Sequence, residues 1–119
     1  MLFGGARPIM PGKTDRARRV AEELEVHRAA YDALNARYRV RAHAMWVTHL
    51  SGGLDLWVYI YDMEPEDLRT MREERVWDPE QSAYDRWWLG WVNDVLGVDM
   101  QTDNGFAAPP ERIFDWTAP

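Results

Sequence analysis

The sequence predicts a single-domain α+β protein, because segments that alternate polar and apolar residues lie between segments of helical periodicity. A hairpin signal lies near the middle of the chain, where Ser51-Gly52-Gly53 separates two runs of β-favouring residues. On both sides of this hairpin, apolar residues recur every three or four positions, which is typical of amphipathic helices. The 119 residues suit one domain with one core, and we expect that domain to span residues 1–119.

The composition limits the classes of function. The formal net charge is −6, so we do not expect the basic surface that a nucleic-acid partner requires. The chain has no cysteine, which removes disulfides, thiolate metal sites and cysteine nucleophiles. No apolar run reaches the ~18 residues of a membrane span, and the N-terminus is unlike a signal peptide. We therefore expect no membrane partner and a cytoplasmic location.

The first part of the chain predicts a strand followed by a long helix. Residues 2–10 can form the strand, which ends at the turn signal Pro11-Gly12. Thr14 and Asp15 are expected to begin the helix as its N-cap and first-turn acid. The apolar stripe of this helix predicts about five turns. The stripe consists of Ala17, Val20, Ala21, Leu24, His27, Tyr31 and Leu34.

The rest of the chain predicts the hairpin, two more helices and a final strand. Residues 38–50 and 54–61 are the expected hairpin strands. Pro65 and the acids around it begin a second helix that ends near Val76, and Pro79 begins a third that ends at Gly97. The third helix carries a stripe of Tyr84, Trp87, Trp88, Trp91, Val92 and Val95.

A C-terminal loop and a short strand over residues 112–117 complete the expected fold within residues 99–119. The resulting order is β-α-β-β-α-α-β. It predicts a ferredoxin-like split βαβ sandwich with one extra helix.

The register of the hairpin decides which side chains share a face of the sheet. A three-residue turn pairs Leu50 with Leu54, whereas a two-residue turn mixes charged and aliphatic residues on both faces, so we prefer the former. One face is then nearly all apolar and suits packing beneath the helices: Val40, Ala42, Ala44, Trp46, Leu54, Leu56, Val58 and Ile60. The opposite face contains Arg39, Arg41, His43, Met45, Val47, His49, Trp57, Tyr59, Tyr61 and Met63.

We expect this second, aromatic face to remain free of helices. An exposed apolar patch of that extent usually marks an interaction site. The seven tryptophans also suggest more buried surface than one small core requires. The sequence therefore predicts a homodimer in which two such faces close into a barrel with a semi-polar cavity in each half.

Several short motifs resemble a known superfamily. PIMPGK (residues 8–13) and WVYIYDMEPEDL (57–68) look like the dimeric α+β barrel superfamily, which includes antibiotic-biosynthesis monooxygenases and tetracenomycin-type polyketide cyclases. IFDWTAP (113–119) resembles the tail of those cyclases. Together with AYDRWW (83–88) and VLGVDM (95–100), it is also similar to a group of uncharacterised actinobacterial proteins. The resemblance implies a dimeric α+β barrel that acts on polycyclic or phenolic metabolites.

His43 is the strongest catalytic candidate. In the preferred register it lies opposite Tyr61, with Arg41 next along the same face. An imidazole beside a phenol and a guanidinium could transfer a proton and stabilise an enolate or phenolate. The alternative is that His43 only forms a hydrogen bond across a dimer interface.

Other residues are candidates for substrate binding. Trp57 and Tyr59 could stack on a flat aromatic substrate or fill the dimer interface, and Met45 shares their face. His49 is expected at the rim of the pocket, and His27 on the helical stripe is a reserve candidate. His43 and His49 are about 20 Å apart along one strand, so they cannot share a metal ion. We expect no metal and no organic cofactor.

These observations lead to three hypotheses. The first is an enzyme of specialised metabolism such as antibiotic biosynthesis, a cyclase or isomerase that transfers protons on an aromatic or polyketide substrate. The second is a cofactor-independent monooxygenase, in which the substrate itself activates oxygen. The third is a non-catalytic protein that binds a hydrophobic metabolite.

Overall fold

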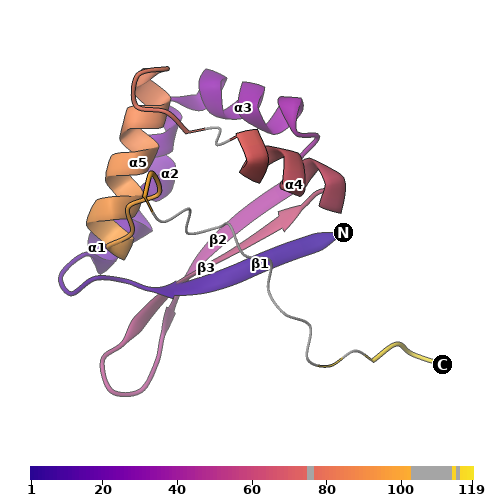
Figure 1. The fold of residues 1–119 in the computed structure, drawn as a ribbon. Coiled ribbons are helices and arrows are strands. Elements are labelled where there is room, and N and C mark those ends of the chain that lie inside the picture. The colour runs from indigo at the N-terminus through magenta and orange to yellow at the C-terminus, as the bar shows by residue number, and fades with distance from the viewer. Residues whose placement is uncertain (75–76, 103–113, 115) are drawn as a thin grey trace.

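The computed structural model describes residues 1–74, 77–102, 114 and 116–119, which form a mixed α+β fold (Figure 1). The described residues contain a three-stranded antiparallel sheet and five helices. In the described part of the chain, no helix is long and apolar enough to cross a membrane. In chain order the elements are β1 (Leu2–Pro8), α1 (Thr14–Arg18), α2 (Val20–Glu25), α3 (Arg28–Arg37), β2 (Ala42–His49), β3 (Asp55–Asp62), α4 (Pro65–Glu74) and α5 (Ala83–Leu96).

The sheet has the order β1-β3-β2, with β3 in the centre. His43 pairs with Tyr61, and the Leu50 N–H donates to the Leu54 carbonyl at 2.8 Å. The prediction of a three-residue turn, with odd residues opposite odd residues, is therefore confirmed. Gly52 and Gly53 have φ values of 90° and 81°, a left-handed conformation that glycine adopts without steric cost.

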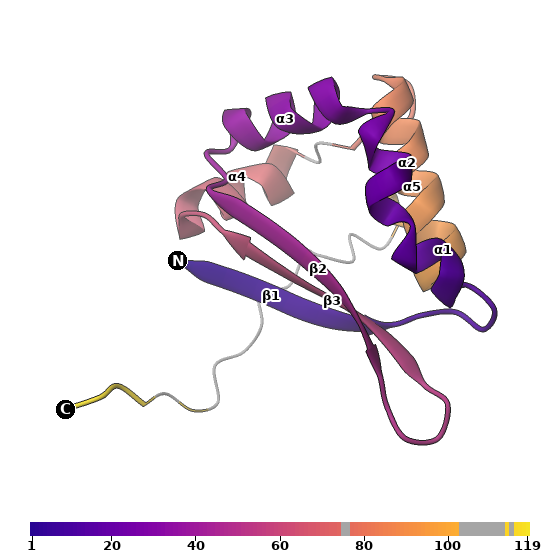
Figure 2. The same cartoon turned by 180° about the vertical axis from the view of Figure 1, so that it is seen from behind.

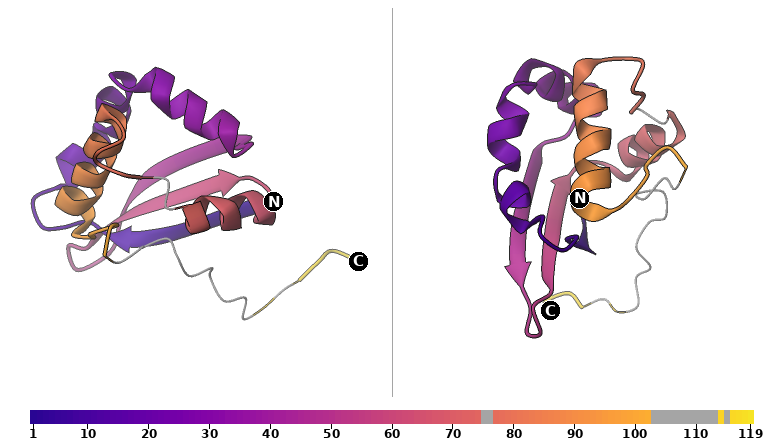
Figure 3. Two further views of the ribbon diagram at one scale, coloured as in Figure 1. Left: turned by 45° about the horizontal axis from the view of Figure 1, so that its top comes forward. Right: turned by 90° about the vertical axis from the view of Figure 1, so that its left-hand side faces the viewer.

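The prediction of which face the helices cover is wrong. All the described helices lie on the side of the sheet that carries the odd-numbered residues of β2 and β3 (Figure 3). Trp57 on that side is 1% exposed, whereas Trp46 on the other side is 48% exposed. The reason is aromatic packing: Trp57 meets Trp91 edge-to-face at 5.6 Å and Trp88 at 6.3 Å, both on α5. Large rings of this kind contribute more buried area than the aliphatic residues of the other face.

The expected five-turn helix is instead three short helices. The backbone leaves helical geometry at Arg19 and again at His27, where ψ is 10° and 19°. These breaks allow α1 and α2 to run beside α5, while α3 turns away and crosses above the sheet toward α4 (Figure 2). Thr14 is not an N-cap, because its hydroxyl donates to the Asp55 carboxylate at 2.6 Å and ties α1 to the hairpin.

The last helix begins later than expected. Asp78 and Pro79 lie before α5, and Ser82 is its N-cap, accepting a hydrogen bond from the Asp85 N–H at 3.1 Å. Gly97, with φ of 67°, ends the helix as predicted. The helix also supplies the centre of the core, because Trp91, Val92 and Val95 are fully buried.

The predicted final strand lies largely outside the described residues. Residues 112, 113 and 115 are not described, and Phe114 and Trp116 are in no strand and are 80% and 70% exposed. The described elements that can position a functional site are therefore the three-stranded sheet and the helices that pack on one of its faces.

Candidate functional site

The helices and the covered face of the sheet enclose an uncharged chamber. Three residues of the sheet form its floor, while α2, α3, α4 and α5, with Trp77 between the last two helices, form its walls and roof. Among the described lining residues there is no Lys, Arg, Asp or Glu. The lining residues are Val20, Leu24, Tyr31, Leu34, Asn35, His43, Met45, Tyr61, Met71, Trp77, Tyr84, Trp87 and Trp88.

His43 is the histidine of this chamber, and its ring has contacts with two tyrosines. Its Nδ1 lies 2.7 Å from the Tyr31 hydroxyl on α3, within hydrogen-bonding distance. Its face stacks on Tyr61, with ring centroids 3.9 Å apart and planes 8° from parallel. Its Nε2 is buried and has no hydrogen-bond partner among the described residues. One nitrogen therefore fixes the ring, and the other is available to a ligand.

Burial decides the charge of these groups. It lowers the pKa of His43 to about 4, so the imidazole is neutral near pH 7. It raises the pKa of Tyr61 and of Tyr84 well above their ordinary value, so both phenols keep their protons. The chamber therefore presents neutral hydrogen-bonding groups among aromatic walls.

The open space inside the chamber is small. It measures about 20 Å³, roughly the room that one water molecule needs. Pockets for drug-sized ligands measure about 300–1,000 Å³. Binding of an aromatic molecule would therefore require a wall to move.

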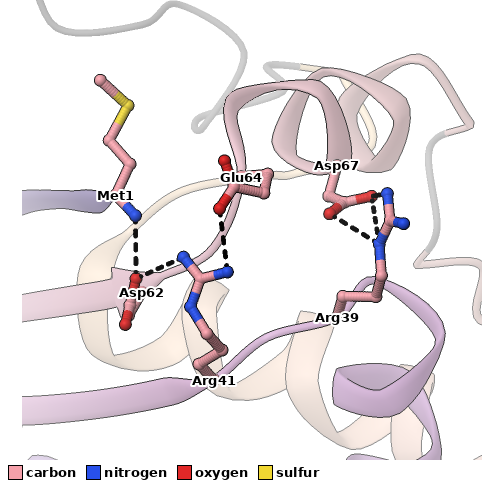
Figure 4. Close-up of polar contacts among 6 residues, drawn as sticks. All are labelled: Met1, Arg39, Arg41, Asp62, Glu64 and Asp67. Atoms are coloured by element: carbon pink, nitrogen blue, oxygen red, sulfur yellow. Dashed lines mark hydrogen bonds and ion pairs between the residues drawn. The ribbon is translucent and has the colours of Figure 1, made fainter.

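Arg41 does not accompany His43 in the chamber. Its guanidinium donates to Asp62 at 2.7 Å and to Glu64 at 3.0 Å (Figure 4). Asp62 also accepts from the Met1 amine at 3.0 Å, so this network joins the strand ends at the surface. The structure thus brings His43 and Tyr61 together but places Arg41 elsewhere.

Trp57 and Tyr59 lie on the covered face but do not line the chamber. Trp57 belongs to the core and stacks on Tyr59, with ring centroids 4.8 Å apart. Met45 does line the chamber, as a substrate-binding residue would. The stacking surface expected from Trp57 is therefore occupied by α5.

The other two histidines lie outside the chamber. His49 is exposed at the hairpin, where its Nδ1 lies 2.6 Å from the Asp55 carboxylate and its Nε2 lies 3.2 Å from Arg18. His27 stacks behind the wall on Trp87, with ring centroids 5.2 Å apart. Neither histidine is among the lining residues.

The chamber also includes Tyr31, Tyr84 and Trp88, which the sequence did not single out as site residues. All three belong to the helical stripes that predicted packing surfaces. A tyrosine at such a position is a usable signal, because its hydroxyl needs a partner when the ring is buried. The partner itself, His43 in the case of Tyr31, is set by the tertiary fold.

Comparisons with known proteins do not assign this chain to a family. No protein-family model matches it, and no curated protein or solved structure is significantly similar to it.

Proposed function

We propose that this protein is a small-molecule enzyme of specialised metabolism that transfers protons on an aromatic or polyketide-derived substrate without a metal or organic cofactor. One observation carries the proposal. The buried imidazole of His43 has an Nε2 without a hydrogen-bond partner among the described residues, in a chamber whose described lining is aromatic and uncharged. Perturbed titratable groups in such enclosed sites are common among catalytic residues.

His43 would be the central residue of the reaction, and Tyr61 would hold it. Stacking on Tyr61 fixes the plane of the imidazole, and aromatic walls favour flat substrates. Because the described lining of the chamber contains no charged residue, an enolate or phenolate would be stabilised there by neutral N–H and O–H donors. Arg41 has no part in this proposal, since its guanidinium is paired with Asp62 and Glu64.

Entry of a substrate would require α3 to move. Not one residue of this ten-residue helix is buried, and non-helical residues flank it at His27 and Tyr38. The Tyr31–His43 hydrogen bond joins its middle to the sheet. Its C-terminal end is tied to α4, because Arg37 and Tyr38 both donate to Glu74. The N-terminal part of α3 is held by the Tyr31–His43 hydrogen bond and by the stack of His27 on Trp87, so entry at that end would require these two contacts to open.

One observation favours non-catalytic binding as the second candidate. A histidine whose pKa lies near 4 is a weak base at neutral pH. It still provides a directional hydrogen bond to a ligand. The same chamber would then sequester or deliver a hydrophobic metabolite.

The open face of the sheet supports a homodimer, as part of a ferredoxin-like, dimeric α+β barrel architecture. Within the described residues 2–8, 42–48 and 56–60, the outward side chains carry no charge. The same face carries small residues at Gly4 and Ala6 on β1 and at Ala44 on β2, and Trp46 on β2 is 48% exposed. A two-fold axis could insert the Trp46 of each chain over the small residues of the other, because such an interface is self-complementary.

The function is tested by turnover of a panel of phenols, naphthols and anthrones, followed by spectroscopy and mass analysis. His43→Gln keeps a hydrogen-bonding side chain of similar size but cannot take part in proton transfer. We expect turnover to fall about 10²–10⁴-fold. His27→Gln, which lies behind the wall, is the matched control and should retain parental turnover.

The possible outcomes separate the candidates. Parental turnover in His43→Gln would contradict the assignment of His43. Binding of the panel without turnover in the parent would favour the binding protein. Oxygen consumption with the anthrones would instead identify a monooxygenase.

A further inference from the structure

A second unpaired polar group lines the same chamber as His43. Trp88 on α5 is 6% exposed, and its Nε1–H has no acceptor among the described residues. His43 Nε2 is also buried without a partner in the described part of the chain. Buried polar groups in folded proteins are nearly always hydrogen-bonded. The indole nitrogens of Trp57 and Trp91 also lack a partner among the described residues, but neither residue lines the chamber. His43 and Trp88 are therefore the two groups that a ligand in the chamber could pair.

The bond to Tyr31 decides what His43 offers to such a ligand. The Tyr31 hydroxyl lies 2.7 Å from Nδ1. Because a phenol is a good hydrogen-bond donor and a bare imidazole nitrogen is a good acceptor, we assign the donor role in this contact to Tyr31. A neutral imidazole has one proton, which must then lie on Nε2. His43 and Trp88, which both line the chamber, thus each carry a buried N–H without an acceptor among the described residues.

We propose that His43 Nε2–H and Trp88 Nε1–H form a two-donor site for the carbonyl oxygen of a neutral aromatic ligand, and that Tyr31 is the positioning residue that keeps the His43 proton on Nε2. This inference rests on the proposed function, because both place a ligand in the same chamber. Beyond the proposed function, the two donors specify an aryl ketone as the class of ligand and direct its carbonyl oxygen toward His43 and Trp88.

Among the described residues, the uncharged lining of the chamber disfavours the nearest alternatives. A carboxylate would lose its hydration without gaining a cationic partner from the described lining, which contains no Lys or Arg. An ammonium ligand would meet N–H donors and no carboxylate. A neutral carbonyl needs only donors.

The site is tested by NMR of the full-length protein with two probes of similar shape, acetophenone and ethylbenzene. Each of the seven tryptophans gives an indole N–H signal. The signal that is missing from the spectrum of Trp88→Phe belongs to Trp88. We expect acetophenone to move the Trp88 indole signal downfield, whereas ethylbenzene leaves it in place. We also expect acetophenone to bind more tightly than ethylbenzene and than benzoate.

Trp88→Phe should weaken acetophenone binding about three- to tenfold without affecting ethylbenzene. Trp91→Phe is the matched control, because Trp91 stacks on Trp88 but does not line the chamber. It should leave the preference for acetophenone unchanged. Both variants are compared at temperatures well below their melting points.

The role of Tyr31 is read from the ¹⁵N shifts of the His43 ring, which distinguish the two neutral tautomers. We expect the Nε2–H form in the parent and in Tyr84→Phe, and a mixture of both forms in Tyr31→Phe. A predominant Nδ1–H form in the parent would overturn the assignment of Tyr31 and of the donor.

The binding results distinguish this inference from the proposed function. Equal affinity for acetophenone and ethylbenzene, with no shift of the Trp88 signal, would overturn the two-donor site and leave an aromatic chamber. Binding of neither probe would overturn both. Binding of acetophenone as expected, with no turnover of any substrate, would support the two-donor site while contradicting the enzyme.

Discussion

His43 and Tyr61 stack face to face from paired positions on neighbouring strands, with ring planes 8° apart. The phenol ring covers one face of the imidazole and keeps water away from it. The two ring nitrogens are left to act in the plane of the ring, Nδ1 toward Tyr31 and Nε2 without a partner among the described residues. This geometry keeps the histidine neutral and oriented.

The first prediction concerns the pH dependence of stability. The pKa of His43 is about 4 in the folded protein and about 6.5 when unfolded. The unfolded chain therefore binds more protons between these pH values, and stability falls as the pH is lowered from 6.5 to 4. The loss from this one group is about 3 kcal/mol. Chemical denaturation of the parent and of His43→Gln at several pH values measures it. A slope that is as steep in His43→Gln as in the parent would show that other groups cause the loss.

The second prediction concerns assembly. We expect a homodimer at micromolar concentration, with twice the 14.0 kDa chain mass in light scattering. Trp46→Glu places a charge on the open face and should yield monomers, because burial of an unpaired charge is costly. Val26→Glu, at an exposed apolar position beyond the end of α2, should leave the dimer intact. A parent protein of single-chain mass across this range would exclude the dimer.

The third prediction compares the effect on stability of replacing two glycines, one inside α5 and one at its C-terminal end. Gly90 lies inside α5 with open space where a Cβ would stand, so Gly90→Ala should stabilise the protein by about 0.5–1 kcal/mol. Gly97 has φ of 67°, and its Cβ would lie 2.8 Å from the Met10 sulfur. Gly97→Ala should therefore destabilise by about 1 kcal/mol or more. Thermal unfolding of the two variants should give shifts of opposite sign, and shifts of the same sign would contradict this account of the helix end.

The fourth prediction concerns Trp57, which the sequence suggested as a stacking surface for substrate. Trp57 is fully buried against Trp88 and Trp91, so Trp57→Leu should destabilise the fold by about 2–4 kcal/mol. Trp116→Leu, at a position 70% exposed, should have almost no effect. Urea unfolding measures both. An unchanged midpoint in Trp57→Leu would show that this ring is not part of the core.

The pairing of the hairpin, and with it the set of residues on each face, follows from local sequence alone. A two-residue periodicity sorts the side chains, and the glycines at 52 and 53 set the turn, so the pairing of His43 with Tyr61 is encoded within this short segment. The end of the last helix at Gly97 is predictable for the same kind of local reason.

The face that the helices cover is instead a property of the tertiary structure. Both faces carry enough apolar area to be buried, so periodicity cannot choose between them. The choice depends on the fit of Trp57 against Trp88 and Trp91, which lie more than thirty residues along the chain. The partner of His43 is set in the same way, because the break at His27 turns α3 across the sheet and brings the Tyr31 hydroxyl to the imidazole. Contacts between distant segments depend on the packing of whole elements, and no local pattern encodes them.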